Sequence, residues 1–235
     1  MFTGIVQGVR KVTVITDLKG GRRLRIQLND LAENLQHGSS VAVNGVCLTA
    51  IKIEEGCAEF DIIQESLDRS NLGALVNGDS VDIERACYFG DEVGGHQVTG
   101  HIDCTGKIDE IRKTPNNRDV VVYCEEEWGR YLIPKGWIAI DGVSLTVVDV
   151  GDNWFSISLI PETLEHTVLG QKVEGDKVNL EFDLTTKVIV KTIQRMFPEI
   201  KKQILNRLTI LQIYPSSHKQ KTPRMRGKLV NNHFQ

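Results

Sequence analysis

The sequence contains no long apolar run, and no stretch approaches the ~20 residues that a membrane-spanning helix requires. The first residues, MFTGIVQGVRKV, lack the basic start and apolar stretch of a secretory signal peptide. Hydrophobic residues make up 40% and charged residues 25% of the chain, which is ordinary for a globular protein. We therefore expect a cytoplasmic protein without a membrane partner.

Paired cysteines are also missing, because no Cys-x-x-Cys motif occurs and the number of cysteines is odd. This pattern argues against a disulfide framework and a structural zinc site, and it favours a reducing compartment. The sequence also lacks the Gly-Lys-Ser/Thr of a P-loop and the fingerprint of a dinucleotide-binding fold. The five cysteines are Cys47, Cys57, Cys87, Cys104 and Cys124.

Acidic residues are absent from residues 201–235, which carry eight Lys or Arg side chains. Residues 1–200 therefore have a charge balance of −11, and such an acidic body is not typical of a nucleic-acid enzyme. No nucleic-acid partner is expected. The basic end fits either a solvated tail or a contact with something anionic.

The main body of the sequence is a duplication. VAVNGVCLTA returns as IAIDGVSLTVV with a constant offset of 97 and no gaps. Two copies of about 95 residues indicate tandem domains rather than a solenoid, whose repeats span ~20–50 residues. The matching segments are 41–50 with 138–147, 64–73 with 161–170, 76–84 with 173–181 and, at an offset of 96, 3–6 with 99–102.

Each copy reads mostly as β-strand. Asn44–Gly45 and Asp141–Gly142 lie between alternating apolar residues, which is the strongest local signal for a hairpin with a type I′ turn. Short strands at regular spacing favour small barrels with Greek-key connections. The sequence therefore predicts an all-β protein of two tandem antiparallel barrels, at 1–96 and 97–185, followed by a helix and basic tail at 186–235.

Helical periodicity begins at Thr186, where apolar residues recur at steps of three and four. Pro198 lies inside this stretch and predicts a kink or a restart of the helix. The apolar stripe fits packing on its own barrel and packing on another subunit equally well. Ser66 and Thr163 fit the start of short helical turns as ordinary caps. The stripe contains Ile189, Ile193, Met196, Ile200, Ile204 and Leu208.

The repeated hairpins carry a short polar face. Side chains alternate across a strand, so Cys47 and Thr49 share one face while the apolar residues beside them face the core. Ser144 and Thr146 repeat this arrangement in the second copy. Such a surface fits a flat heteroaromatic ligand held at its edges, and it also fits the plain outer face of a half-buried strand.

The connector between the copies contains two histidines, His96 and His101, among glycines. They fit general acid–base groups, structural histidines, or metal ligands together with Asp103 and Cys104, although no pair has a zinc-type spacing. His101 aligns with Ile5 of the first copy, so the two copies differ chemically at this position.

Five motifs together resemble the riboflavin synthase family, whose chains are tandem lumazine-binding repeats. They are MFTGIV, VNGVCLT, GGHQVTGHID, IDGVSLTVV and IPETLEHTVLG, and the resemblance covers about residues 1–197. It implies two six-stranded Greek-key barrels, a C-terminal helix and a homotrimer. It also implies the dismutation of two 6,7-dimethyl-8-ribityllumazine molecules into riboflavin and 5-amino-6-ribitylaminouracil, without a metal or organic cofactor. Each active site then holds two substrate molecules between the first barrel of one subunit and the second barrel of its neighbour.

The resemblance also implies the ligand contacts. We hypothesise that His101 and Ser144 assist proton transfer and activation of a nucleophile, with Asp141 and Thr146 supporting them and Cys47 serving the first barrel. The implied contacts of the first barrel are Gly4, Ile5, Val6, Cys47, Leu48, Thr49, Asp61, Ile62, Ile63, Gln64, Glu65, Ser66, Gly100, His101 and Ile102. Those of the second barrel are Lys135, Ser144, Leu145, Thr146, Ile160, Pro161, Glu162, Thr163, Leu164 and Glu165.

A rival interpretation is a non-catalytic relative similar to the lumazine proteins of luminous bacteria, which bind one chromophore. Those relatives have lost polar groups in the second repeat. Here Lys135, Ser144, Thr146 and the segment IPETLE all remain. The sequence therefore favours the enzyme.

Overall fold

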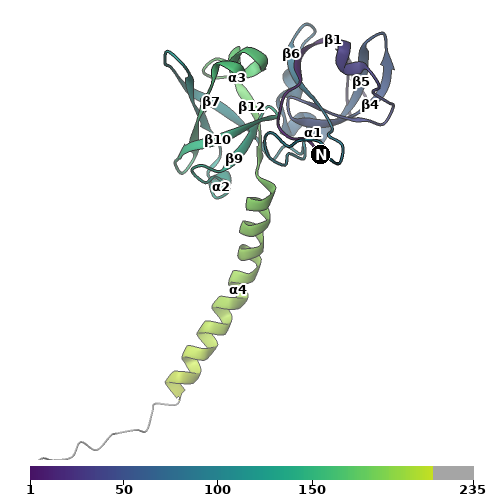
Figure 1. Cartoon of the computed structure of the whole chain (residues 1–235). Helices are drawn as coiled ribbons and strands as arrows, with labels where there is room; N and C mark the ends of the chain where they lie inside the picture. The colour runs from purple at the N-terminus through teal and green to yellow at the C-terminus, as the bar shows by residue number, and fades with distance from the viewer. Residues whose placement is uncertain (214–235) are drawn as a thin grey trace, which may run out of the picture. The chain divides into compact units, whose positions relative to one another are not determined.

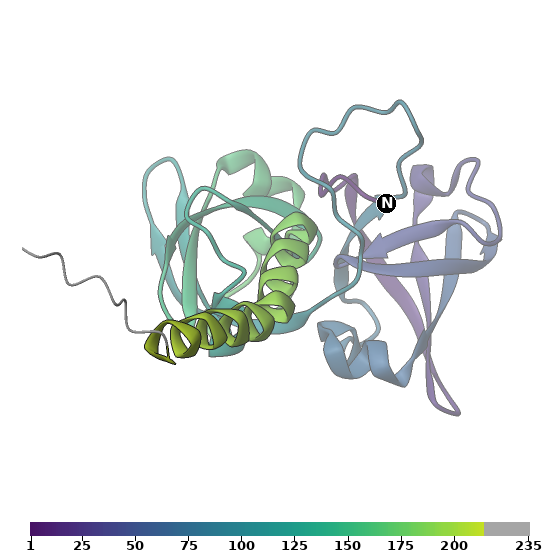
Figure 2. The same cartoon turned by 90° about the horizontal axis from the view of Figure 1, so that it is seen from below.

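A computed structural model describes residues 1–213, with side chains to residue 203. The expectation of a solvated tail falls mostly outside these residues, as do the side chains of Ile204 and Leu208. Two closed six-stranded antiparallel barrels follow one another along the chain (Figure 1). The connector 86–103 between them runs as a long loop (Figure 2), and the predicted boundary at 96/97 falls within it.

The two barrels have the same topology. The first has the strand order β1-β2-β5-β4-β3-β6, and the second repeats this order with β7 to β12. Hairpins join β3, β4 and β5, and β6 returns to pair with β3, which is a Greek key. The predicted fold class is therefore confirmed.

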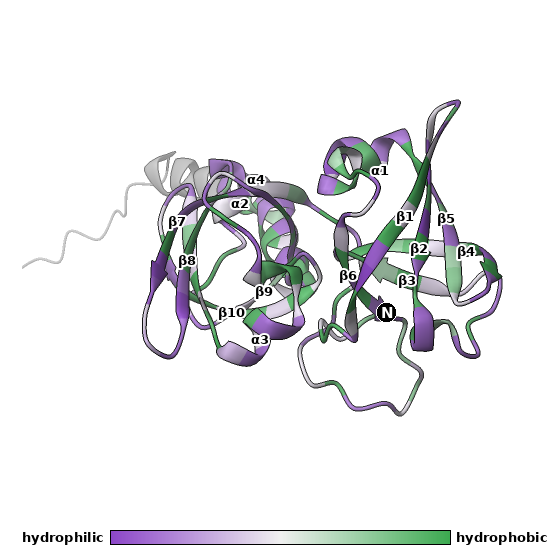
Figure 3. Cartoon of the chain, turned by 90° about the horizontal axis from the view of Figure 1, so that it is seen from above, coloured by the Kyte–Doolittle hydropathy of each residue, from purple (hydrophilic) through white to green (hydrophobic). Residues whose placement is uncertain are grey.

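The strands of the first barrel are β1 (Gly8–Leu18), β2 (Gly21–Gln27), β3 (Ser40–Val43), β4 (Val46–Glu54), β5 (Cys57–Ile63) and β6 (Ser80–Arg85). Those of the second are β7 (Cys104–Lys113), β8 (Arg118–Tyr123), β9 (Trp137–Ile140), β10 (Val143–Val150), β11 (Trp154–Leu159) and β12 (Lys177–Phe182). Each barrel encloses its own apolar core, and the strand ribbons alternate between hydrophobic and hydrophilic residues (Figure 3).

The predicted hairpin turns are confirmed. Asn44 and Gly45 have φ angles of 44° and 78°, and Asp141 and Gly142 have 47° and 89°, so both central residues of each turn have the positive φ that type I′ requires. The two turns also pack against each other, because a Cβ atom on Gly45 would lie 2.6 Å from the backbone nitrogen of Gly142. The repeated phrase therefore forms the seam between the barrels.

Short helices follow equivalent strands in the two barrels. The residues that precede α1 (Gln64–Arg69) and α3 (Pro161–His166) are isoleucines without a capping side chain, so the interpretation of Ser66 and Thr163 as caps is wrong. Instead, their carbonyl groups accept hydrogen bonds from the hydroxyls one helical turn later. The other short helices are α2 (Glu126–Gly129) and the 3₁₀ turns η1 (Asn29–Ala32), η2 (Asn71–Ala74) and η3 (Val168–Gly170).

The last element is α4 (Leu184–Ile213), which begins two residues before the predicted start. Asp183 caps it, because its Oδ1 accepts a hydrogen bond of 2.7 Å from the backbone N–H of Thr186. The helix continues through Pro198 without a restart. No helix within residues 1–213 is long and apolar enough to cross a membrane.

Candidate functional site

Each barrel carries one candidate surface, which we call the first site (around Cys47) and the second site (around Ser144). Cys47 and Ser144 are half-buried, and the threonine two residues after each is exposed. The intervening Leu48 and Leu145 are only 5% and 8% exposed and belong to the barrel cores. The predicted faces of the strands are therefore confirmed.

Three predicted ligand contacts have side chains that point into a core. Leu48, Leu145 and Ile62, which is 2% exposed, fill the barrel interiors. Their side chains therefore face away from the strand surfaces, and their assignment as ligand contacts stays a prediction. The neighbouring Ile63 and Ile160 are 62% and 57% exposed and lie where each strand passes into a short helix.

The two Thr-Gly segments are exchanged between the barrels. The carbonyl of Gly100 accepts a hydrogen bond of 2.8 Å from the N–H of Cys47, and the carbonyl of Gly4 accepts one of 2.8 Å from the N–H of Ser144. The assignment of Gly4, Ile5 and Val6 to the first site is therefore wrong. Val6 packs on the core of the second barrel, and the equivalent Ile102 packs on the core of the first.

Close approach explains why both segments need glycine. A Cβ atom on Gly100 would lie 2.5 Å from the Cβ of Cys47, and one on Gly4 would lie 2.6 Å from the Cβ of Ser144. Both glycines also have positive φ angles, of 80° and 77°. The residues that follow, His101 and Ile5, are exposed beside the two strands.

The first site includes an ion pair that the sequence did not suggest. Ala50 pairs with Phe60 on the next strand, which brings Thr49 beside the exposed Asp61. Asp61 binds Arg23 through two hydrogen bonds of 2.6 and 2.9 Å. The hydrogen bond from Arg23 lowers the pKa of Asp61 below its usual range. Only the strand register reveals Arg23 as a member of this site, because β2 pairs with β5 at this position.

In place of this ion pair, the second site has a neutral side chain beside an acidic one. Ser158 stands at the position of Asp61, and Asp119 stands at that of Arg23. The hydroxyl of Ser158 donates a hydrogen bond of 2.7 Å to Asp119. Lys135 is placed at this edge by its N–H bond of 2.8 Å to the carbonyl of Val147. The two sites thus share a scaffold and differ in charge.

His96 is the histidine that the structure brings to the second site. Its Nδ1 lies 2.6 Å from the Oγ of Ser144, and its ring stacks on Trp137 with centroids 5.9 Å apart. The side chain is 5% exposed, and burial lowers its pKa. A neutral imidazole at this distance can accept the proton of the serine hydroxyl. The sequence suggests an acid–base role for His96 as one alternative. Its hydrogen bond to Ser144, however, joins residues 48 positions apart and has no local signal in the sequence.

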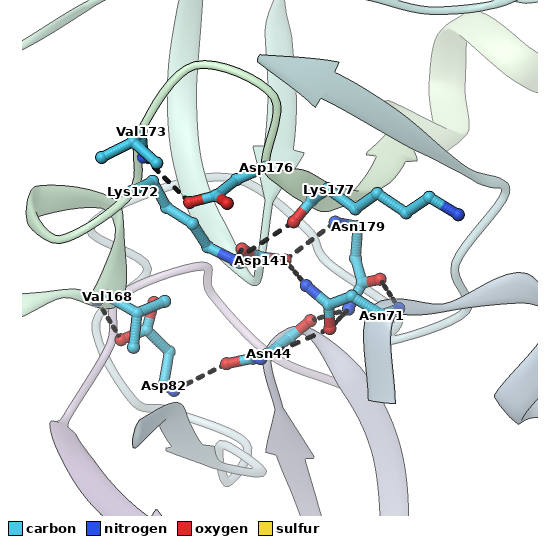
Figure 4. A network of polar contacts seen from close by, with 10 residues as sticks. All are labelled: Asn44, Asn71, Asp82, Asp141, Val168, Lys172, Val173, Asp176, Lys177 and Asn179. Atoms are coloured by element: carbon cyan, nitrogen blue, oxygen red, sulfur yellow. Dashed lines mark hydrogen bonds and ion pairs between the residues drawn. The ribbon is translucent and has the colours of Figure 1, made fainter. Parts of the chain in front are cut away.

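Asp141 does not lie at either site. It is completely buried in the seam, where its Oδ1 accepts hydrogen bonds of 2.8 Å from the N–H of Asn179 and of 2.8 Å from the side chain of Asn71 (Figure 4). Burial raises its pKa, and Lys172 opposes this effect. Its assignment as a catalytic group is therefore corrected: Asp141 holds the two barrels together.

The alternative of a metal site at His96, His101, Asp103 and Cys104 finds no support in their placement. Asp103 accepts a hydrogen bond of 2.7 Å from Lys187, and burial raises the pKa of the Cys104 thiol. Across residues 1–213, no three potential metal ligands gather. All five cysteines are free thiols.

Comparison with known proteins matches both halves of the chain. The lumazine binding domain family matches residues 3–86 and 99–183. A riboflavin synthase of Escherichia coli (strain K12) is 43% identical over 198 residues, covering 83% of this chain and 93% of the relative. One of Mycobacterium tuberculosis (strain H37Rv) is 43% identical over 195 residues, covering 80% and 96%. The chain belongs to the riboflavin synthase family. The predicted enzyme, a transferase of this type, is thereby confirmed.

Solved structures of LumP share the fold. LumP complexed with riboflavin is 27% identical and covers 78% of this chain and 100% of its own, with a TM-score of 0.73. LumP complexed with 6,7-dimethyl-8-(1'-D-ribityl) lumazine is 26% identical, with coverages of 78% and 99% and a TM-score of 0.71. The riboflavin synthases are therefore the more similar relatives in sequence.

Proposed function

We propose that the chain works as a homotrimer in which the first site of one copy faces the second site of its neighbour. Each composite site holds two molecules of 6,7-dimethyl-8-ribityllumazine, and a four-carbon unit passes from one to the other. The products are riboflavin and 5-amino-6-ribitylaminouracil. The observation that carries this proposal is the presence, in one chain, of two equivalent surfaces with unequal polar groups.

The exposed apolar side chains at both sites support a partner surface. Ile63 at the first site is 62% exposed, while Ile5 and Ile160 at the second are 49% and 57% exposed. Ligand sites usually bury most of the ligand, which one open barrel face does not do. Two such faces with two planar rings between them would cover these side chains.

Positioning accounts for most of the catalysis in this proposal. The pteridine ring stabilises the carbanion formed at its own 7-methyl group, so the protein mainly holds two rings face to face. Proximity and orientation lower the activation free energy by ~7–11 kcal/mol. One general acid–base group accelerates a reaction about 10²–10⁴-fold, which corresponds to ~3–5.5 kcal/mol. Ser144, with His96 as its base, activates the nucleophile, and His101 at the opposite face moves the methyl proton. Cys47, Thr49 and Thr146 hold the ring edges.

The C-terminal helix supports assembly. Its apolar side chains recur at helical spacing and are 43–60% exposed in the single chain. A stripe of this kind on one helix face is typical of helix–helix association. We assign it to the contact between copies, and we expect the assembled enzyme in the cytoplasm, where its free thiols stay reduced. The exposed members are Ile189, Ile193, Met196, Phe197 and Ile200.

The test combines turnover with mass. Purified chain mixed with 6,7-dimethyl-8-ribityllumazine is expected to develop riboflavin fluorescence, and light scattering is expected to give three chains per particle. Calorimetric titration with riboflavin is expected to detect two ligand sites per chain. Ligand binding without any riboflavin formation would instead support a non-catalytic role. A single chain that turns over at full rate would exclude the composite site.

A further inference from the structure

We propose that Glu84 and Glu181 are positioning residues that act crosswise, so that each belongs to one barrel and shapes the site of the other. The inference rests on the two sites of the proposed function. The glutamates are equivalent members of β6 and β12, and each pairs with an alanine of the neighbouring strand. They are only 4% and 2% exposed, which makes both of them buried carboxylates outside the ligand surfaces.

Glu181 holds the segment that completes the first site. Its Oε1 accepts hydrogen bonds of 2.8 Å from the N–H of Thr99 and of 2.6 Å from the Thr99 hydroxyl, and its Oε2 accepts one of 2.9 Å from the N–H of Gly100. The same hydroxyl accepts a hydrogen bond of 3.3 Å from the N–H of His101. A residue of the second barrel thereby fixes the peptide that binds Cys47.

Glu84 holds the other segment in the same way. It accepts hydrogen bonds of 2.6 Å from the N–H of Thr3, 2.8 Å from the Thr3 hydroxyl and 3.0 Å from the N–H of Gly4. The Thr3 hydroxyl accepts a hydrogen bond of 3.4 Å from the N–H of Ile5. A residue of the first barrel thereby fixes the peptide that binds Ser144.

Three donors converge on each carboxylate, and this requirement separates Glu from Gln. A carboxylate accepts at both oxygens, whereas the amide of Gln has one acceptor and presents a donor at the other position. Glu→Gln therefore leaves either the glycine N–H or the threonine pair without an acceptor while keeping the side-chain volume. The segment loosens, and the site that loosens is the one on the opposite barrel.

The two glutamates are matched controls for each other. Glu181→Gln is expected to weaken riboflavin binding at the first site about tenfold, and Glu84→Gln to weaken it about tenfold at the second site, because each removes a charge-assisted hydrogen bond. The first site is followed by protection of Cys47 from iodoacetamide, measured by peptide mass spectrometry. The second site is followed by the ¹⁹F signal of Trp137 in fluorotryptophan-labelled chain, assigned with Trp137→Phe. Riboflavin is the titrated probe in both experiments.

The inference would be overturned if each variant weakened riboflavin binding at the site of its own barrel. It would also be overturned if each variant weakened binding at both sites equally. A merely structural role predicts that equal weakening, because loss of stability is not selective for one site. If a glutamine variant does not fold, Thr99→Val and Thr3→Val take its place, since they remove only the hydroxyl of the same network and are expected to show the same crossed pattern.

Hydrogen exchange separates this inference from the proposed function. In ligand-free chain, Glu181→Gln is expected to speed exchange at residues 99–102 and at the Cys47 amide, and Glu84→Gln at residues 3–6 and at the Ser144 amide. This pattern does not depend on lumazine. Unchanged exchange at both amides would overturn the crossed positioning, while a wild-type chain that makes no riboflavin would overturn only the proposed function.

Discussion

Asp82 and Asn179 occupy equivalent positions of β6 and β12 and show how far a single residue has diverged between the copies. The side-chain amide of Asn179 donates a hydrogen bond of 2.8 Å to the carbonyl of Asn44 across the seam. When its carboxyl is ionised, Asp82 has no hydrogen to donate there, and its Oδ2 is buried without a hydrogen-bond partner among the described residues. Burial raises the pKa of Asp82 well above the usual 3.8, and nearby Asp141 adds to this effect.

Asp82→Asn is therefore expected to stabilise the protein at neutral pH by about 1 kcal/mol, because it supplies the missing donor and removes a buried charge. With a raised pKa, the folded state of the parent binds more protons than the unfolded state. The stability that Asp82 contributes is thus fully present below about pH 3.8 and is lost as pH rises through its folded pKa. The gain of the variant should grow with pH in urea unfolding. Asn179→Asp is the reverse control, and a loss of stability in Asp82→Asn at neutral pH would contradict the argument.

His101 offers a test of chemistry at the residue scale. It is exposed beside Cys47, so a substitution there leaves the core untouched. His101→Ala is expected to lower the single-turnover rate about 10²–10⁴-fold, as the loss of a general acid–base group does, while riboflavin binding changes little. Stopped-flow measurement at saturating lumazine checks this. An unchanged rate would remove His101 from proton transfer.

The two hairpin turns carry the seam at the scale of elements. A Cβ atom on Gly45 would meet the backbone of Gly142 at 2.6 Å, whereas one on Gly20, in the turn between β1 and β2, would meet nothing within 4 Å. Both glycines have positive φ angles, of 78° and 85°.

Gly45→Ala is expected to destabilise the protein more than Gly20→Ala does. Backbone strain costs about 1 kcal/mol at either position, and the clash at the seam adds to it only at Gly45. Thermal unfolding of both variants measures the difference. Equal losses would mean that the turns do not press on each other in solution.

Particular turns and segments show which parts of the structure could be predicted from the sequence and which could not. The turns at Asn44–Gly45 and Asp141–Gly142 were predictable because residue type and φ are linked within two residues. The exchange of segments 3–6 and 99–102 was not, because each segment has the same motif and fits the equivalent strand of either copy. Two further contacts were not predictable either: the hydrogen bond between His96 and Ser144 and the ion pair between Arg23 and Asp61. They depend on strand register and on contacts between distant segments, which no local pattern encodes.

At the scale of the whole molecule, the question is whether one catalytic site draws on one chain or on two. His101→Ala damages the first site and leaves Ser144 intact, while Ser144→Ala damages the second site and leaves His101 intact. If each site joins the first site of one copy to the second site of its neighbour, a mixed assembly contains some junctions whose halves are both intact. Equal co-expression gives intact halves at about a quarter of the junctions, since each half is intact with a probability of one half.

Co-expressed His101→Ala and Ser144→Ala chains, carrying different tags and purified through both, should therefore recover activity that neither variant shows alone. Purification through both tags removes the unmixed assemblies, and each remaining trimer has one junction whose halves are both intact. The expected level is therefore about a third of the parent rate per junction. Mixing the two purified variants without exchange of subunits is the control, and it should stay inactive. A site contained in one chain cannot be restored in this way, because every chain carries a damaged half. Co-purified assemblies that remain as inactive as the separate variants would thus place both substrate molecules within a single chain.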